Sequence, residues 1–182
     1  IAERLFERGD MPVHYFGNKR SPLAVDARFA ARATAIEDAT ELAKLVREIV
    51  LDEDAASRVA VIIEQLGDFL QTSADGPLVD LVRAIKREDH FAVAEAESSS
   101  WVTSWPLFGE FKSARRGLIL QPDSTDGDVI LKTSLPRLKR AEFPVGRGML
   151  VSSGQAMRVQ LALVGSSEEP SLAGVAAVPR GL

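Results

Sequence analysis

The sequence predicts an α/β fold built on a largely parallel sheet, flanked by helices and closed at one side by antiparallel strands. Strand and helix signals alternate along most of the 182 residues. Residues 58–63 (RVAVII) form a continuous apolar run rich in β-branched residues, typical of a parallel strand buried on both faces. Residues 149–163 show the apolar alternation of a C-terminal hairpin that turns at residues 152–155. The length suits one ordinary domain.

The first third of the chain predicts a helix, two short strands and a longer helix. Residues 1–9 have the pattern of a helix end that Gly9 stops, and residues 13–16 and 29–33 are typical of short strands. Thr34 and Glu37 have the spacing of a capping box, in which each side chain satisfies an unpaired amide. The next helix has an apolar stripe of Ile36, Ala39, Ala43, Val46 and Val50, widened by Leu42, Leu45 and Ile49.

The alternation continues after the buried run. A helix is expected to start at Asp75 and Pro77, and a strand follows at 91–96. A further helix is expected to open at Ser104 with Pro106, because proline suits the first helical position.

The end of that helix is basic, and Gly117 is predicted to stop it. Lys112, Arg115 and Arg116 are expected in its last turn, where they complement the helix dipole. A strand at 118–120 follows directly. We expect a domain over residues 1–165 and a flexible tail over 166–182, which is rich in Ser, Gly, Pro and Ala without a period.

The composition excludes several classes of protein. The chain has 22 Lys and Arg against 26 Asp and Glu, a net charge of −4, which argues against a surface that binds nucleic acid throughout. The absence of cysteine excludes disulfides, thiolate metal sites and cysteine nucleophiles. No apolar run approaches the roughly 18 residues that a membrane helix needs.

Motifs of common catalytic sites are also missing from these 182 residues. There is no G-x-x-x-x-G-K-[ST], G-x-G-x-x-G, H-E-x-x-H or G-x-S-x-G. His14 and His90 lie far apart and lack metal-ligand spacing, so we expect them at a strand edge or a helix end. The acidic segment 123–128 lacks the ligand spacing of an EF-hand loop and predicts a plain connection. No metal site is predicted.

One acidic position is a candidate for chemistry. The buried run ends in Glu64-Gln65. In nucleoside-triphosphatase folds such a strand ends in an acid that holds the magnesium-bound water, and a second acid often orients the attacking water. Here the second position is Gln65, which is neutral. Taken alone, the pair is more typical of a strand that simply leaves the sheet into solvent.

Four motifs together resemble actinobacterial FtsK/SpoIIIE-type ATPases. They are FGNKRSPL at 16–23, Glu64-Gln65, RRGLILQPDSTDGD at 115–128, and FPVGRGMLV at 143–151 with RVQ at 158–160. The sequence is most similar to the last ATPase-like module of multi-module members, a class that includes the EccC and EssC ATPases of type VII secretion. The resemblance covers residues 1–164 in order, and its C-terminal motifs are the more specific.

The resemblance implies a truncated RecA-like P-loop NTPase fold. It places residues 1–9 at the end of the helix that follows the phosphate loop, so the phosphate loop and its strand would precede Ile1. The family's acidic Walker B pair falls on Glu64 and Gln65, where the second acid is lost. Its polar sensor would fall within residues 97–100, although the sequence AESSSW departs from the pattern of the DNA translocases.

These implications predict a degenerate module that does not hydrolyse ATP. No nucleotide-binding residues and no cofactor are expected in this chain, whereas ATP and magnesium are expected for a parent protein that hydrolyses ATP as a translocase. The module would serve assembly, regulation or substrate recognition. It would lie at the cytoplasmic face of the plasma membrane without inserting, next to other ATPase modules of the same protein.

Two surfaces are candidates for partner binding. By resemblance, the module would dock a signal segment of a secreted substrate, and aromatic residues form the candidate surface: Trp101, Trp105, Phe108 and Phe111. Aromatic residues at helical spacing are more often part of a core, which is the alternative for these four. The alternative is a DNA-translocating module of a chromosome-segregation ATPase, whose phosphate contacts would come from Arg115, Arg116, Arg137 and Arg140, flanked by Lys112 and Lys139. A third possibility is that Arg115 or Arg116 reaches a neighbouring module across an interface.

Overall fold

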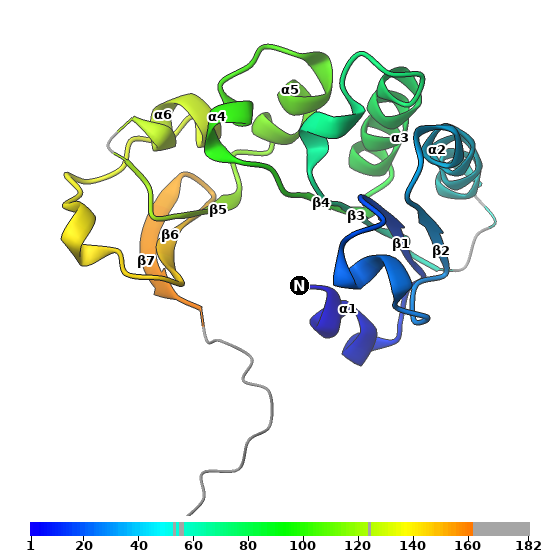
Figure 1. Ribbon diagram of the computed structural model, residues 1–182, viewed down its shortest axis with the longest axis horizontal. Helices are drawn as coiled ribbons and strands as arrows, with labels where there is room; N and C mark the ends of the chain where they lie inside the picture. Colours follow the sequence, from blue (N-terminus) through cyan, green and yellow to red (C-terminus); the bar gives the residue numbers. More distant parts are fainter. Residues whose placement is uncertain (53, 55–56, 124, 162–182) are drawn as a thin grey trace, which may run out of the picture.

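The computed structural model describes residues 1–52, 54, 57–123 and 125–161, and it confirms the α/β class (Figure 1). The predicted tail at 166–182 and Leu163 of the predicted hairpin lie outside the described residues. The helices are α1 (Ala2–Arg8), α2 (Ile36–Leu51), α3 (Asp75–Arg87), α4 (Ser98–Trp101), α5 (Pro106–Lys112) and α6 (Asp126–Leu131), with 3-10 turns η1 (Pro22–Val25), η2 (Leu66–Phe69) and η3 (Arg140–Glu142). The strands are β1 (Val13–Phe16), β2 (Ala31–Ala33), β3 (Ala60–Ile63), β4 (Phe91–Ala94), β5 (Gly117–Leu120), β6 (Arg147–Ser152) and β7 (Gln155–Gln160).

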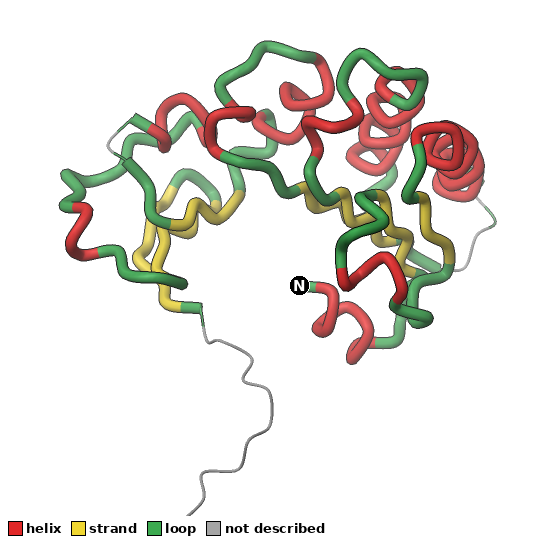
Figure 2. Tube along the Cα trace, viewed as in Figure 1, coloured by secondary structure: helices red, strands yellow, loops and turns green. Residues whose placement is uncertain are grey.

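The strands form two separate sheets. Four parallel strands run in the order β2-β1-β3-β4, and β5, β6 and β7 form an antiparallel sheet in that order. The antiparallel strands were expected to close the parallel sheet, but β5 pairs with β6 and not with β4. Figure 2 shows the strands of both sheets along the inner side of an arch, with α2 to α6 outside them.

Helices cover the two faces of the parallel sheet unequally. The larger core cluster joins β1 and β3 to α2, α3 and α5, and it contains fully buried residues such as Val61, Val46 and Leu78. The smaller cluster lies on the opposite face, where Leu5 of α1 packs with Val13, Tyr15, Phe29, Ala60 and Ile62. Since β3 is buried at all four positions, the prediction of a two-sided buried strand is confirmed.

The start of α2 corrects the predicted capping box. The N-cap residue is Ala35, which has an extended backbone and no side-chain cap, so Thr34 lies one residue too early for its hydroxyl to cap the first turn. The predicted stripe is buried at Ala39 and Val46, but Leu45 and Ile49 are 53% and 36% exposed. These two residues lie beyond the edge of the face that packs on the sheet.

The segment after α5 corrects the predicted helix stop. The helix ends at Lys112, with Ser113 as C-cap, and Gly117 is the first residue of β5. Arg115 and Arg116 therefore follow the helix instead of forming its last turn. A short helix, α6, also forms where the acidic segment predicted a plain connection. Pro106 is the first residue of α5, as predicted, with Trp105 rather than Ser104 at the N-cap.

The C-terminal hairpin is confirmed. β6 and β7 pair antiparallel around a two-residue turn, whose residues Ser153 and Gly154 have φ of 53° and 74°. Two successive positive φ values are the geometry that matches the twist of the flanking strands. Within the described residues, no helix is long and apolar enough to span a membrane.

Candidate functional site

The C-terminal edge of the parallel sheet gathers the candidate chemistry. Phe16, Ile63 and Ala94 are paired in register at the ends of β1, β3 and β4. The residues that follow these strands therefore lie at one edge, which is where open α/β sheets place their ligand sites. Glu64 and Gln65 follow β3, as predicted, and Glu95 follows β4.

Glu64 is held by a buried tyrosine. The hydroxyl of Tyr15 donates a hydrogen bond to Oε2 of Glu64 at 2.5 Å, and the tyrosine is fully buried. Burial, followed by the bond to the Glu64 carboxylate, raises the pKa of Tyr15 to about 12, so the phenol stays protonated and donates. The phenol reaches this place because Gly17 has no side chain; a Cβ there would collide with the Tyr15 hydroxyl.

Gln65 has a left-handed backbone, with φ 51° and ψ 54°. This conformation is uncommon for a residue other than glycine. Glu95 stabilises it from the neighbouring strand end, because the Gln65 amide donates to Oε2 of Glu95 at 3.1 Å and the Leu66 amide donates to its backbone oxygen at 2.9 Å. The Gln65 side chain is exposed at the sheet edge.

Tyr15 and Glu95 are functional residues that the sequence did not predict. The family resemblance implied a polar position within residues 97–100, but β4 ends at Ala94, and Glu97 is already the N-cap of α4. If the strand predicted at 91–96 had been predicted to end at Ala94, Glu95 would have been placed opposite Glu64. No sequence signal marks Tyr15 as the partner of Glu64, since the two are 49 residues apart.

The residues at this edge do not fit a magnesium-bound triphosphate by themselves. Glu64 supplies one carboxylate, and one of its oxygens already accepts a hydrogen bond from the Tyr15 hydroxyl. Gln65 adds an amide, which cannot accept a proton at neutral pH. Among the described residues no group of three His, Cys, Asp or Glu side chains could hold a metal ion.

The predicted aromatic surface divides into buried and exposed parts. Trp101 packs edge-to-face on Phe108 and Phe111, with ring centroids 4.8 Å and 6.3 Å apart. Phe108 is fully buried, so its predicted place on a binding surface is wrong: it is a core residue. Trp105 is 39% exposed, and its neighbour Val102 is 58% exposed.

The loop that carries Trp105 is tied down from both sides. Nε1 of Trp101 donates to the backbone oxygen of Ala96 at 3.2 Å. Nζ of Lys112 donates to the backbone oxygens of Trp101 and Thr103 at 3.0 and 2.7 Å. Lys112 is thus engaged within the loop, and Trp105 projects from an ordered base.

The four predicted arginines are all exposed: Arg115, Arg116, Arg137 and Arg140. Arg115 has φ 49° and donates from Nη2 to the backbone oxygen of Lys132 at 3.0 Å, which ties the segment after α5 to the end of α6. Within the part of the chain that the structure describes, none of the four forms an ion pair with a carboxylate. Apart from that bond of Arg115, these exposed guanidinium groups are accessible to an anionic partner, and that role stays a prediction.

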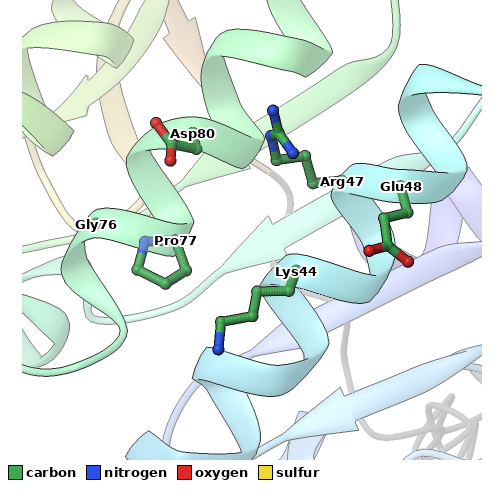
Figure 3. Close-up of a pocket in the computed structure, with 6 residues that line it drawn as sticks. All are labelled: Lys44, Arg47, Glu48, Gly76, Pro77 and Asp80. Atoms are coloured by element: carbon green, nitrogen blue, oxygen red, sulfur yellow. The ribbon is translucent and has the colours of Figure 1, made fainter.

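An open pocket lies between α2 and α3, on the outer side of the sheet (Figure 3). Its charged side chains are of both signs, and its lining consists of Lys44, Arg47, Glu48, Gly76, Pro77 and Asp80. Because the two basic and two acidic groups balance, the pocket favours neither an anion nor a cation.

Comparison with solved structures decides what this arrangement resembles. No protein-family model and no curated protein matches the sequence. The cytoplasmic domain of EssC matches with a TM-score of 0.62 at 16% identity, over 88% of this chain and 35% of that one. Thermomonospora curvata EccC (ATPases 2 and 3), in complex with a signal sequence peptide, matches with a TM-score of 0.65 at 16% identity, over 86% of this chain and 32% of that one.

The chain has the fold of a type VII secretion ATPase module. The cytoplasmic domain of the T. curvata type VII secretion ATPase EccC agrees, with a TM-score of 0.60 at 17% identity, over 86% of this chain and 20% of that one. The predicted resemblance is thereby confirmed at the level of the fold. The chain spans a third or less of the two EccC structures and 35% of the EssC domain, so it corresponds to part of each.

Proposed function

We propose that this chain is a RecA-like module of a type VII secretion ATPase that does not hydrolyse ATP and acts in assembly, regulation or substrate recognition. The observation that carries the proposal is the likeness of fold to EssC and EccC over 86–88% of the chain. In this role the module lies at the cytoplasmic face of the plasma membrane, beside other ATPase modules of the same protein, and ATP and magnesium belong to the parent.

Two features of the sheet edge support the non-hydrolysing state. Gln65 stands where a general base is expected, and removing a positioned base costs about 10²–10⁴-fold in rate. The Tyr15 hydroxyl occupies Oε2 of Glu64, so a water held by this carboxylate would have to compete with the phenol. Both features weaken the orientation of an attacking water.

Substrate recognition is supported by the exposed part of the aromatic cluster. The T. curvata EccC neighbour was solved with a signal sequence peptide. Here Trp105 and Val102 project from a loop that is fixed by Trp101 and Lys112. An exposed aromatic side chain on an ordered base is the kind of anchor that carries most of the binding energy in peptide interfaces. We propose that this loop contacts apolar side chains of a signal segment.

The experiment is a titration of the 182-residue chain into a fluorescently labelled signal-sequence peptide from a secreted substrate. Trp105→Ala is expected to weaken binding by about 10-fold or more, the loss typical of an interface anchor. Leu45→Ala is the matched control, because Leu45 is an exposed apolar residue on α2, away from this loop. Equal affinities of wild type and Trp105→Ala for the peptide would show that this loop does not contact it.

Binding to duplex DNA is the competing outcome. The four exposed arginines would then make phosphate contacts, and affinity would fall steeply with salt. The double variant Arg137→Ala/Arg140→Ala is expected to lose that binding. The proposed secretion role requires instead that the wild-type chain bind the peptide and leave a labelled 20-base-pair duplex unbound at about 150 mM salt.

A further inference from the structure

The bond between Tyr15 and Glu64 is the inner end of a row of packed side chains that begins on α1. Phe6 of α1 packs edge-to-face on Phe29, with ring centroids 5.0 Å apart. Phe29 packs in turn on Tyr15 at 5.1 Å, and the Tyr15 hydroxyl donates to Oε2 of Glu64. Because Phe29 is 6% exposed and Tyr15 is fully buried, the row is continuous from the helix to the carboxylate.

Arg28 fixes the outer end of this row. Its guanidinium lies 4.4 Å from the centroid of the Phe6 ring. It donates to both carboxylate oxygens of Glu3, in the first turn of α1, at 2.6 and 2.7 Å. It also donates from Nη2 and Nε to the carboxylate of Asp26 at 2.6 and 3.0 Å. Since Asp26 and Phe29 both lie in the loop between η1 and β2, Arg28 fastens α1 to the segment that carries Phe29.

Helix α1 has few other attachments to the sheet. Among the described residues of α1, Leu5 alone is buried, whereas α2 and α3 bury five and six residues on the opposite face. An element with few buried apolar contacts opens at a lower free energy than the core does. Helix α1 can therefore leave the sheet without unfolding of the larger core cluster.

Departure of α1 would change the surroundings of Tyr15. Without Phe6, water would reach Phe29 and then the tyrosine ring. A hydrogen bond is stronger in a dry place of low dielectric constant than in water, where water competes for both partners. The phenol would then bond to water for part of the time, and the Glu64 carboxylate would be free to accept another donor. The position of α1 and the state of Glu64 are thus linked through one covered ring.

We propose that α1 is a latch on Glu64. While Arg28 holds α1 in place, Phe6 and Phe29 keep the Tyr15 hydroxyl on the carboxylate, and release of α1 frees the carboxylate. Arg28, Phe6 and Phe29 are positioning residues, because they act through Tyr15. The coupling is reciprocal, so a partner that takes up the Glu64 carboxylate loosens α1. This inference goes beyond the proposed function, since it concerns what controls Glu64 whether the module binds a peptide, DNA or neither.

Nuclear magnetic resonance of Tyr15 tests the latch. Tyr15 is the single tyrosine of the chain, so tyrosine labelled with carbon-13 at Cζ gives one resonance that reports its phenol. The position of this resonance in Glu64→Ala marks the state without the bond. Arg28→Ala in the 182-residue chain is expected to move the resonance from its wild-type position toward that mark by more than its linewidth, because α1 is released in a larger fraction of the molecules. Arg28→Lys keeps the charge and is expected to reduce the shift.

Two further variants keep this test decisive. Arg4→Ala is the matched control, because Arg4 lies on the same helix, is 85% exposed and pairs with Glu7; its resonance is expected to coincide with that of the wild type. Phe6→Leu interrupts the row without changing any charge, and it replaces Arg28→Ala if that variant does not fold. A Tyr15 resonance that stays at the wild-type position in folded Arg28→Ala, or in Phe6→Leu, overturns the proposal. An equal shift in Arg4→Ala also overturns it.

The reverse coupling is measured on α1 itself. Tyr15→Phe removes the bond at the inner end of the row. The Cα shifts of residues 3–7 are then expected to move toward coil values, since a helix as short as α1 is marginal away from its packing surface. The Cα shifts of α2, which packs on the opposite face, are the internal control. A modest loss of global stability leaves both sets unchanged, because the unfolded fraction stays small. Unchanged shifts in α1, or equal changes in both helices, overturn the latch.

Discussion

At the scale of single residues, the bond between Tyr15 and Glu64 is the interaction that most sets the character of the sheet edge. Tyr15→Phe removes the donor and leaves a half-buried carboxylate without its partner. We expect the free energy of unfolding to fall by about 1–3 kcal/mol. Urea unfolding measures it. The control is a double-mutant cycle with Glu64→Gln, in which a coupling energy near zero would contradict the interaction.

The loss of the second acid gives a prediction about rate. Gln65→Glu in the parent protein restores a carboxylate at the position of the expected base. Where the parent protein supplies a phosphate loop to this module, ATP hydrolysis by the module should rise by about 10²-fold or more. Phosphate release measures it, with Gln65→Asn as the control that restores no base. Hydrolysis by the wild type at the same rate as Gln65→Glu would contradict a non-hydrolysing module.

His14 makes stability depend on pH. Its ring is buried in β1, and among the described residues neither of its nitrogens has a hydrogen-bond partner. Burial lowers the pKa of His14 below its ordinary value of 6.5, because a charged ring at this position would lie away from water without a partner. The unfolded chain therefore takes up a proton first, so stability is complete above pH 6.5 and is lost as the pH falls toward the lower pKa of the folded state.

Urea unfolding at pH 7.5 and 5.5 tests this dependence. The free energy of unfolding of the wild type should fall between the two values, and His14→Leu should reduce that fall. Other groups titrate in the same range, so the comparison is the difference between the two proteins and not the wild-type slope alone. An equal fall in both would show that His14 is not responsible.

At the scale of elements, substitution by alanine at two glycines in different environments is expected to change stability in opposite directions. Gly154 in the β6–β7 turn has φ 74°, which an alanine adopts only with strain, so Gly154→Ala should destabilise by about 1 kcal/mol. Gly109 lies inside α5, and a Cβ there would meet open space. Gly109→Ala should therefore stabilise by about 0.5–1 kcal/mol. Thermal unfolding measures both, and equal signs would contradict the two backbone assignments.

Several elements could be predicted from the sequence because their signals are local. The buried run of β3, the proline that opens α5 and the turn at Ser153 and Gly154 need only neighbouring residues for their effect. The prediction of a capping box at Thr34 was wrong because the position of a cap depends on the residue at which the chain leaves the preceding strand. The stop at Gly117 failed because pairing with β6 takes that residue into a strand.

At the scale of the whole molecule, Trp101 links the two sheets. It packs against the core of the parallel sheet and against the α6 cluster of the antiparallel sheet. Trp101→Ala should cost about 3–5 kcal/mol, as for other large aromatic residues in a core. It should also uncouple the sheets, so that unfolding followed by far-UV circular dichroism and by Trp105 fluorescence no longer coincides. Trp105→Ala is the control and should lower the Tm little. Coincident transitions in Trp101→Ala would contradict the link.

The candidate site could be predicted only in part. Glu64 and Gln65 follow from the position of one buried strand, and their place at the sheet edge holds. Tyr15 and Glu95 come to this edge from other strands, so their contacts depend on strand order and register. For the same reason the aromatic residues could be named from the sequence, but the burial of Phe108 and the exposure of Trp105 could not.

The sequence by itself determined the α/β class, the buried central strand, the terminal hairpin and the neutral residue after Glu64, because each depends on the residue types at adjacent positions in the chain. Only the tertiary structure decided that β5 leaves the parallel sheet, that Tyr15 holds Glu64, and that Phe108 is buried while Trp105 is exposed. These features depend on which strands become neighbours. That choice is made by packing between distant segments, and no local pattern encodes it.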